Sequence, residues 1–186
     1  MMVVAIVVGV LLIALVLIYN GLVRSRNKVD EAWSGIDVQL KRRHDLVPNL
    51  VETVKGYAEH EQRVLNEVTN ARQTAVSASG PAEAAPAEQA LGAALGRVVA
   101  LAEAYPQLRA SESFVELQGE LSETEDQIAG ARRIYNSNTQ VYNSRIQTIP
   151  GLLVAPVTGF RAREYFEMDD AGDAAPVGVA FSRGTA

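Results

Sequence analysis

Residues 29–75 read VDEAWSGIDVQLKRRHDLVPNLVETVKGYAEHEQRVLNEVTNARQTA, and they carry the longest regular pattern in the chain. Two sets of positions, each spaced by seven residues and offset by four, are almost entirely apolar. They are Val29, Ile36, Arg43, Leu50, Tyr57, Val64 and Ala71, and Trp33, Leu40, Val47, Val54, Glu61, Val68 and Ala75. Spacings that alternate between three and four residues are typical of a helix packed along a partner. The pattern predicts one long helix, about 70 Å from Val29 to Ala75, that can be continuous with the apolar N-terminus.

Pro48, followed by Asn49, lies inside this predicted helix. Proline in a helix interior removes one hydrogen bond and clashes with the preceding turn. Two interpretations are open: a kinked but continuous helix, or a break at which Asp45 caps a new helix that has Pro48 in its first turn. The seven-residue register runs unbroken through Pro48, and it favours the continuous helix.

Residues 1–20 have the length and composition of a transmembrane anchor. Residues 1–19 contain no charged side chain, and about 20 apolar residues span the hydrocarbon core of a bilayer. No basic residue precedes the apolar run and no A-x-A cleavage site follows it, which favours an uncleaved anchor over a signal peptide.

An aromatic and three basic residues follow at the predicted membrane edge, namely Tyr19, Arg24, Arg26 and Lys28. Basic residues next to a span remain in the cytoplasm. We therefore expect a single-pass protein of the bacterial cell membrane, with its N-terminus outside and its folded domain in the cytoplasm. The cations also offer contacts to anionic membrane lipid.

The next segments predict a connection and a shorter helix. Residues 77–90, SASGPAEAAPAEQA, are small, polar and interrupted by proline, which predicts a hinge at the far tip of the bundle. A helix from Leu91 to Tyr105 follows, and Pro106 ends it.

A last long helix is predicted from about Ser113, which forms a capping-box pattern with Glu116. Its apolar positions also recur every seven residues, at Phe114, Leu121, Ile128, Tyr135, Tyr142 and Ile149. Pro150 and Gly151 stop this helix. Residues 151–160 are apolar but irregular, and either cap the bundle or return to the membrane surface. Residues 163–170 are short and amphipathic, and 168–186 have the composition of a disordered tail.

The dipeptide Tyr-Asn occurs twice in this helix, at Tyr135-Asn136 and at Tyr142-Asn143. The seven-residue gap is the helix period, so we expect the tyrosines to pack in the seam, with their hydroxyls bonded at its edge. We expect the asparagine amides to bond across helices. A ligand site is the alternative interpretation.

Arg43 and Glu61 are the two charged residues in the apolar seam. A charge held there needs a partner, and Glu125 or Arg132 of the last helix can supply one. We expect a polar layer that fixes the register of the helices. The alternative is a polar pocket that binds a ligand.

Several kinds of chemistry are absent from the sequence. With no cysteine, thiol catalysis and zinc-thiolate sites are excluded, and a net charge of −5 does not favour nucleic acid as a partner. His44 and His60 are too far apart on one helix to share an ion, so no metal and no cofactor is predicted. Neither a catalytic triad nor a phosphate-binding loop occurs. An acidic stripe, Glu116, Glu120 and Glu123, is typical of a solvated face or of a contact to Lys41 and Arg42 of a neighbour.

Four stretches together resemble the LemA family of bacterial membrane proteins. They are YNGLVRSRN from Tyr19, VDEAWSGIDVQLKRRHDLVPNLVETVKGYAEHE from Val29, ALAEAYPQLRASESFVELQGELSETEDQIAGARRIYNSNTQVYN from Ala100 and IPGLLVAPVTGFRAREYFE from Ile149. The resemblance implies one N-terminal anchor and an elongated antiparallel helical bundle, and it implies no enzymatic activity. One relative is needed to form magnetosome membranes, which implies a membrane-organising role.

The sequence thus predicts an all-α protein: an anchor at 1–20, a helical bundle of three to four helices at 21–167, and a tail at 168–186. We expect a non-enzymatic scaffold that forms homo-oligomers and organises the membrane. Two alternatives stay open: a monomeric adaptor that docks another membrane protein, such as a protease or a transporter, and a ligand sensor.

Overall fold

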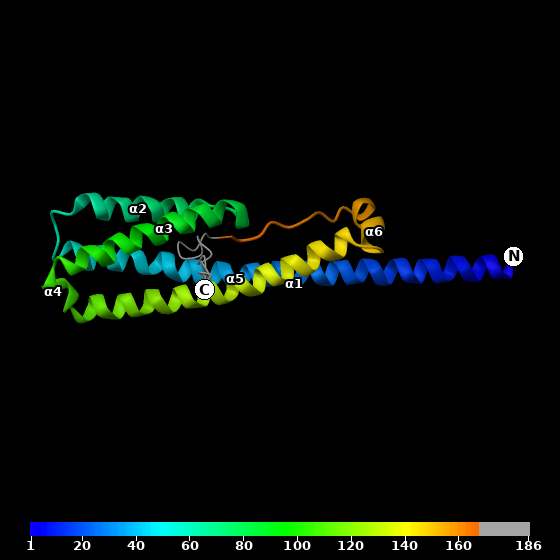
Figure 1. The fold of residues 1–186 in the computed structure, drawn as a ribbon, viewed down its shortest axis with the longest axis horizontal. Helices are drawn as coiled ribbons and strands as arrows, with labels where there is room; N and C mark the ends of the chain where they lie inside the picture. Colours follow the sequence, from blue (N-terminus) through cyan, green and yellow to red (C-terminus); the bar gives the residue numbers. More distant parts are fainter. Residues whose placement is uncertain (168–186) are drawn as a thin grey trace, which may run out of the picture.

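The computed structural model describes residues 1–167, and the predicted tail lies outside them. These residues form six helices and no strand: α1 (Met2–Lys55), α2 (Gln62–Ser77), α3 (Gly80–Glu103), α4 (Pro106–Arg109), α5 (Glu112–Gln147) and α6 (Gly151–Thr158). The chain is therefore all-α, with a long N-terminal helix that continues into an elongated bundle (Figure 1).

Helix α1 runs without a break from the apolar N-terminus into the bundle. Its 54 residues are about 80 Å long. Pro48 lies inside the helix on its exposed side, so the prediction of a continuous helix through this proline is confirmed.

The prediction that this helix extends to Ala75 is wrong. The helix ends at Lys55, Gly56 follows it, and the chain reverses before α2 begins at Gln62. Glycine is a poor helix former, and the reversal allows Val54 and Leu65 to join one core cluster. The seven-residue register continues because α2 returns along the same core.

The predicted hinge at 77–90 is also wrong. Only Ala78 and Ser79 connect α2 to α3, because alanine favours helix formation and Pro81 lies in the first turn of α3, where proline is tolerated. This turn lies in the middle of the body, and the far tip is formed by the α1–α2 turn and α4 (Figure 1).

Helix α5 is antiparallel to α1 and forms the other long element of the body (Figure 1). It begins at Glu112 after Ser111, so Ser113 lies in its first turn and the predicted capping box is wrong. Ile149 was predicted in the seam, but α5 ends before it and its side chain is 77% exposed. Residues 151–158 were predicted to be irregular, yet they form α6.

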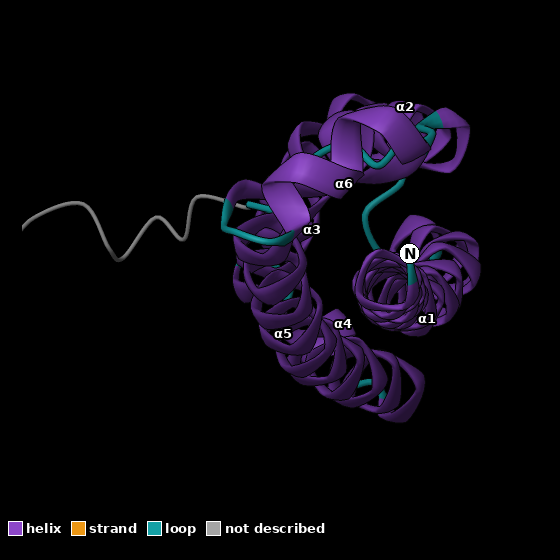
Figure 2. Ribbon diagram, turned by 90° about the vertical axis from the view of Figure 1, so that its right-hand side faces the viewer, coloured by secondary structure: helices purple, strands orange, loops and turns teal. Residues whose placement is uncertain are grey.

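The core consists of two clusters that lie one after the other along the length of the body. In one, the α2–α3 hairpin covers α1 and α5. In the other, α6 and residues 160–166 cover them. Viewed from the N-terminal end, the other helices form an arc around α1 (Figure 2).

Candidate functional site

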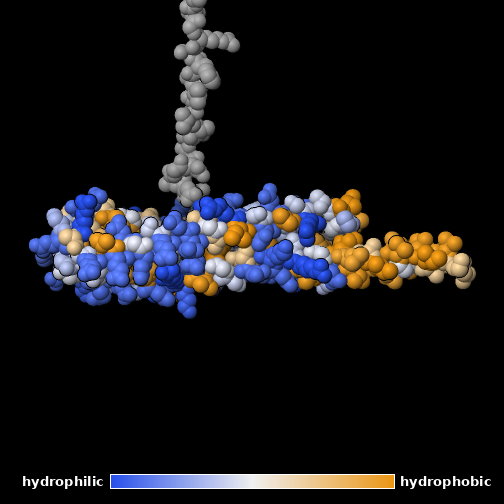
Figure 3. Space-filling model, turned by 90° about the horizontal axis from the view of Figure 1, so that it is seen from below, coloured by the Kyte–Doolittle hydropathy of each residue, from blue (hydrophilic) through white to orange (hydrophobic). Residues whose placement is uncertain are grey.

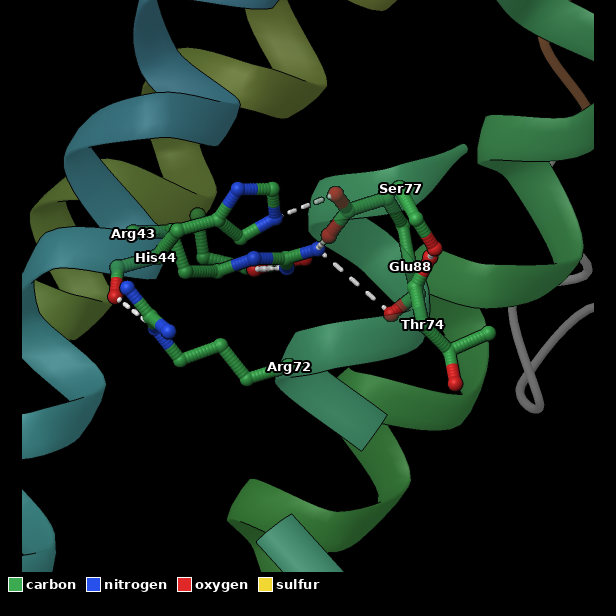
Figure 4. A network of polar contacts seen from close by, with 7 residues as sticks. Arg43, His44, Arg72, Thr74, Ser77 and Glu88 are labelled. Atoms are coloured by element: carbon green, nitrogen blue, oxygen red, sulfur yellow. Dashed lines mark hydrogen bonds and ion pairs between the residues drawn. The ribbon is translucent and has the colours of Figure 1, made fainter. Parts of the chain in front are cut away.

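A charged network is buried where α1, α3 and α5 meet. Arg43 of α1 is 1% exposed and Glu88 of α3 is 0% exposed, and their side chains form an ion pair (Figure 4). The Nη1 of Arg43 also lies 2.5 Å from Oε2 of Glu125 in α5, whose side chain is half-exposed. The guanidinium therefore links three helices.

His44 also binds the carboxylate of Glu88. The Nε2 of His44 lies 2.6 Å from Oε1 of Glu88, and because a carboxylate only accepts hydrogen bonds, this nitrogen carries the proton. The Nε of Arg72 in α2 donates to the His44 carbonyl oxygen at 2.6 Å. Burial raises the pKa of Glu88, but the His44 hydrogen bond and the Arg43 charge outweigh burial and hold the pKa below its usual value.

Glu125 was one of the two charged residues that the sequence offered as partners for Arg43 and Glu61, and Glu88 was missed. It was missed because it lies in the segment that was interpreted as a hinge. A signal was present: the seam of α3 at Leu91 and Val98, extended back by one turn, reaches Ala87 and Glu88.

Glu61 lies apart from this network. It precedes α2 at the far tip, and its Oε1 accepts a hydrogen bond from the Tyr105 hydroxyl at 3.1 Å. The structure therefore does not bring Arg43 and Glu61 together, and the alternative interpretation of one polar pocket around both residues is wrong.

A groove of about 470 Å³ opens beside the network, between α1 and the α2–α3 turn. Lys41 and Arg72 contribute cations to its lining, and His44 contributes a hydrogen-bond donor. Asp37 and Asp45 contribute carboxylates. Within residues 1–167, no three His, Cys, Asp or Glu side chains are grouped so that they can hold a metal ion.

The second candidate site is the pair of Tyr-Asn dipeptides in α5. The Tyr135 hydroxyl donates to the Glu164 carbonyl oxygen at 2.7 Å, and the Tyr142 hydroxyl donates to that of Arg161 at 2.8 Å. We call residues 160–167, which carry these carbonyls, the strap. Burial raises the pKa of both phenols.

The two asparagines bind the backbone of the strap. The Asn143 amide donates to the Arg163 carbonyl at 2.8 Å and accepts from the Arg163 N–H at 2.9 Å. Asn136 forms the same pair with Phe166, at 3.1 and 2.9 Å. The expectation that these amides bond across helices is wrong, because each one pairs with a single residue of the strap as a neighbouring β-strand would.

The heptad spacing of the dipeptides matches the dimensions of the strap. Seven helical residues rise about 10.5 Å, and three extended residues span about 10 Å. The tyrosines bind residues 161 and 164 of the strap, which are three positions apart. The asparagines bind residues 163 and 166, which are also three positions apart. Repetition every seven residues thus lets one helix bind an extended segment twice in the same way.

An aromatic cluster holds the end of the strap. The Trp33 ring of α1 contacts Tyr135 and Phe166 edge-to-face, with centroids 5.5 and 5.4 Å apart. At the other end, Phe160 lies edge-on to Tyr19 at 5.7 Å, and the Arg26 guanidinium lies 5.3 Å above its ring. The strap therefore runs from the predicted membrane edge to the middle of the body.

Basic residues at the predicted membrane edge lie beside the end of α5. Arg24 and Lys28 line a groove with Arg145 of α5, and Arg145 reaches the Gly21 carbonyl at 3.4 Å. Within residues 1–167, α1 is the one helix that is long and apolar enough to cross a membrane. None of its most apolar 18-residue stretch is buried.

The family model for the LemA family matches residues 32–181. This range contains the charged network, both Tyr-Asn dipeptides and the strap. The chain belongs to the LemA family.

The named relatives of the chain include magnetosome proteins and a LemA protein. The chain is 29% identical over 200 residues to Magnetosome protein MamQ 2 of Paramagnetospirillum magneticum, a match that covers 93% of this chain and 74% of that protein, and the values for MamQ 1 of the same organism are identical. It is 29% identical over 133 residues to Protein LemA of Metamycoplasma hominis, which covers 69% of this chain and 59% of that protein. The chain is a membrane-associated helical protein of this family.

Proposed function

We propose that this protein is a non-enzymatic, membrane-anchored scaffold that self-associates and organises the bacterial membrane. One observation carries the proposal: α1 joins the apolar span to the bundle without a break. A continuous helix leaves no flexible linker at which the bundle can swivel. Copies that associate through their bundles would therefore also set the spacing and angle of their spans.

The buried charges favour a structural role over a catalytic one. Arg43 and Glu88 are almost completely inaccessible, and Glu88 pairs with both Arg43 and His44. Breaking such a buried pair is strongly destabilising, so these groups are suited to holding helices in place.

Surface side chains on α5 favour lateral association. Ile134 and Val141 lie one heptad apart, so they share a face of the helix, and they are 61% and 47% exposed. The outer face of an elongated body offers a second copy a long contact, and soluble homo-oligomers are most often symmetric pairs formed by such self-complementary patches.

The test is the particle mass of the full-length protein in mild detergent, by light scattering and native mass spectrometry. We expect uniform assemblies larger than one chain, and we expect the double variant Ile134→Lys, Val141→Lys to reduce their mass. Val115→Lys, at a position that is 56% exposed on the same helix, is the matched control and should leave the mass unchanged. A monomer at all concentrations would refute the scaffold and favour an adaptor for another membrane protein.

A second candidate function, a ligand sensor, is favoured by the groove of about 470 Å³ beside the charged network. Its cationic side would suit a small anion. Arg72→Ala removes one cation from the lining, together with the hydrogen bond to the His44 carbonyl. If the groove binds an anion, thermal protection by added inorganic phosphate should be lost in this variant. If phosphate gives no protection to the wild type, the sensor loses its support.

A further inference from the structure

Helix α6 exposes apolar side chains over about half or more of their surface. Leu152, Leu153 and Val157 are 49%, 69% and 88% exposed, and residues 151–158 include no charged side chain. Single apolar residues are common on protein surfaces, whereas a contiguous apolar patch marks a contact site. Something apolar is needed to cover this face.

The face is continuous with the surface of the predicted span. Leu153 and Val157 of α6 line a hollow of about 310 Å³ with Leu15, Val16 and Tyr19 of α1. Figure 3 shows the apolar surface of the N-terminal helix continuing onto the end of the body where α6 lies. The exposed faces of α6 and α1 thus meet the same surroundings.

Two separate parts of the chain change from uncharged to cationic at the same level. In α1 the change comes at Arg24 and Arg26. In the second part, Arg145 at the end of α5 reaches Gly21 of α1, and the strap begins with Phe160 beneath Arg26. This agreement defines a boundary plane across the molecule, with α6 on its apolar side.

The position of α6 relative to this plane corresponds to the depth of interfacial helices. Leu15 and Tyr19 lie six and two residues before Gly21, which places them about 3–9 Å inside the boundary. Amphipathic helices at the membrane interface bury their apolar face by about 5–10 Å.

Protein contacts alone hold α6 in this place. Gly151 allows the chain to turn at the end of α5, because a Cβ there would lie 1.9 Å from the Arg145 carbonyl oxygen. After α6, Gly159 has a φ of +76°, and Phe160 donates to the Ala155 carbonyl at 3.0 Å. The Tyr-Asn contacts then fix the strap, so α6 is positioned before it meets any lipid.

We propose that α6 is embedded in the bilayer beside the span, in the leaflet on the bundle side, with its exposed face against lipid acyl chains. The inference rests on the membrane anchor of the proposed function and extends it. An element present in one leaflet and absent from the other widens that leaflet around each anchor. This asymmetry gives a rigid scaffold a means of acting on membrane shape.

The test uses the full-length chain, which has no cysteine and accepts single labels. Val157→Cys and Leu153→Cys variants carry an environment-sensitive NBD fluorophore and are reconstituted in phosphatidylcholine vesicles that contain phosphatidylglycerol. Some vesicles include nitroxide-labelled acyl chains as quenchers. Val38→Cys is the matched control, because Val38 is 63% exposed on α1 and lies about 28 Å beyond Tyr19.

We expect blue-shifted NBD emission at positions 153 and 157, with severalfold stronger quenching by nitroxide lipid than at position 38. Equal quenching at all three positions would overturn the proposal. A blue shift without lipid quenching would also overturn it, because it would show that a second copy or another protein segment covers the face. The particle mass of the same samples tests the scaffold separately: lipid quenching of a monomer would refute self-association and leave the placement of α6 intact.

Discussion

Removal of the buried guanidinium should be the most damaging single change in the bundle. Arg43→Met keeps the length of the apolar stem, but it leaves Glu88 at 0% exposure with only His44 as a partner. One carboxylate oxygen loses its donor, and the carboxylate loses its counter-ion. Breaking a buried pair in this way costs about 3–5 kcal/mol.

Protonation sets an independent bound on this cost. If Glu88 is neutral in the folded variant, it must be protonated at pH 7 although its unfolded pKa is about 4.3. This protonation costs about 1.4 kcal/mol per pH unit, or about 4 kcal/mol in total. The two estimates agree. For a domain of this size, each kcal/mol shifts Tm by about 2–4 °C, so we expect a loss of about 6–20 °C at pH 7.

The pH dependence follows from the sign of the shift. In the wild type the pKa of Glu88 is lowered, so its contribution is present above the unfolded pKa and persists at pH 5. In the variant the Arg43 charge no longer opposes the effect of burial, so we expect the native pKa of Glu88 to rise and the cost to fall toward about 1 kcal/mol at pH 5, close to the unfolded pKa. The gap in Tm between the two proteins should therefore narrow as the pH falls.

The assay is thermal unfolding of the full-length protein in detergent, followed by circular dichroism. Arg42→Met is the matched control, because Arg42 is the preceding residue and its contact with Glu123, at 3.4 Å, is solvent-exposed. Exposed pairs contribute about 0–1 kcal/mol. Equal changes in Tm for the two variants, or a gap that does not depend on pH, would refute the assignment of Glu88 as a buried ionised partner.

Three further predictions concern the strap, the turn before α6 and the protonation of Glu88. Asn143→Asp loses the amide N–H that donates to the Arg163 carbonyl of the strap, at a cost of about 1–3 kcal/mol, so trypsin should cleave the strap at its arginines about tenfold faster or more, whereas Asn138→Asp, which does not contact the strap, should not change the rate. Gly151→Ala should lower the stability by about 1–3 kcal/mol, because its Cβ would meet a backbone oxygen at 1.9 Å. Gly130→Ala, with open space around it inside α5, should instead raise the stability by about 0.5–1 kcal/mol, and a loss at Gly130 would contradict the packing described. As the pH falls from the unfolded pKa of Glu88 through its lowered native pKa, the wild type should lose the stability that the ion pair contributes, and Glu88→Gln should abolish that step in an acid titration of unfolding.

The heptads of α1 and α5 were readable in the sequence because apolar side chains report which face of a helix is buried. Ile36, Leu50, Ile128 and Tyr135 are all buried as the pattern predicts. The same pattern did not reveal that the helix ends after Lys55. A heptad pattern reports which side chains face the core. A chain that turns back along the same core continues this pattern, so the pattern does not show where the turn lies.

The binding partner of the Tyr-Asn dipeptides was not readable from their spacing. Asn136 and Asn143 pair with residues that lie 30 and 20 positions later and have no regular secondary structure. Asparagine suits this role because its short side chain presents one donor and one acceptor side by side, which matches the N–H and carbonyl of one extended residue. A serine hydroxyl has one polar atom, and a longer glutamine has one more torsion to fix.

A buried charge in an alanine-rich interface also explains how the α2–α3 hairpin finds its position along α1. The inner face of α3 repeats similar small and apolar residues, Ala84, Leu91 and Val98, at intervals of seven. A shift by one heptad would place apolar groups against apolar groups again and would cost little. That same shift would bring Glu88 opposite Ile36 or Leu50 in place of Arg43, and leave two buried charges unpaired at several kcal/mol. The ion pair therefore contributes to a unique register more than to total stability. The double variant Arg43→Met, Glu88→Met should accordingly unfold near or above the wild-type Tm, and its broadened NMR signals would report a hairpin that exchanges between registers.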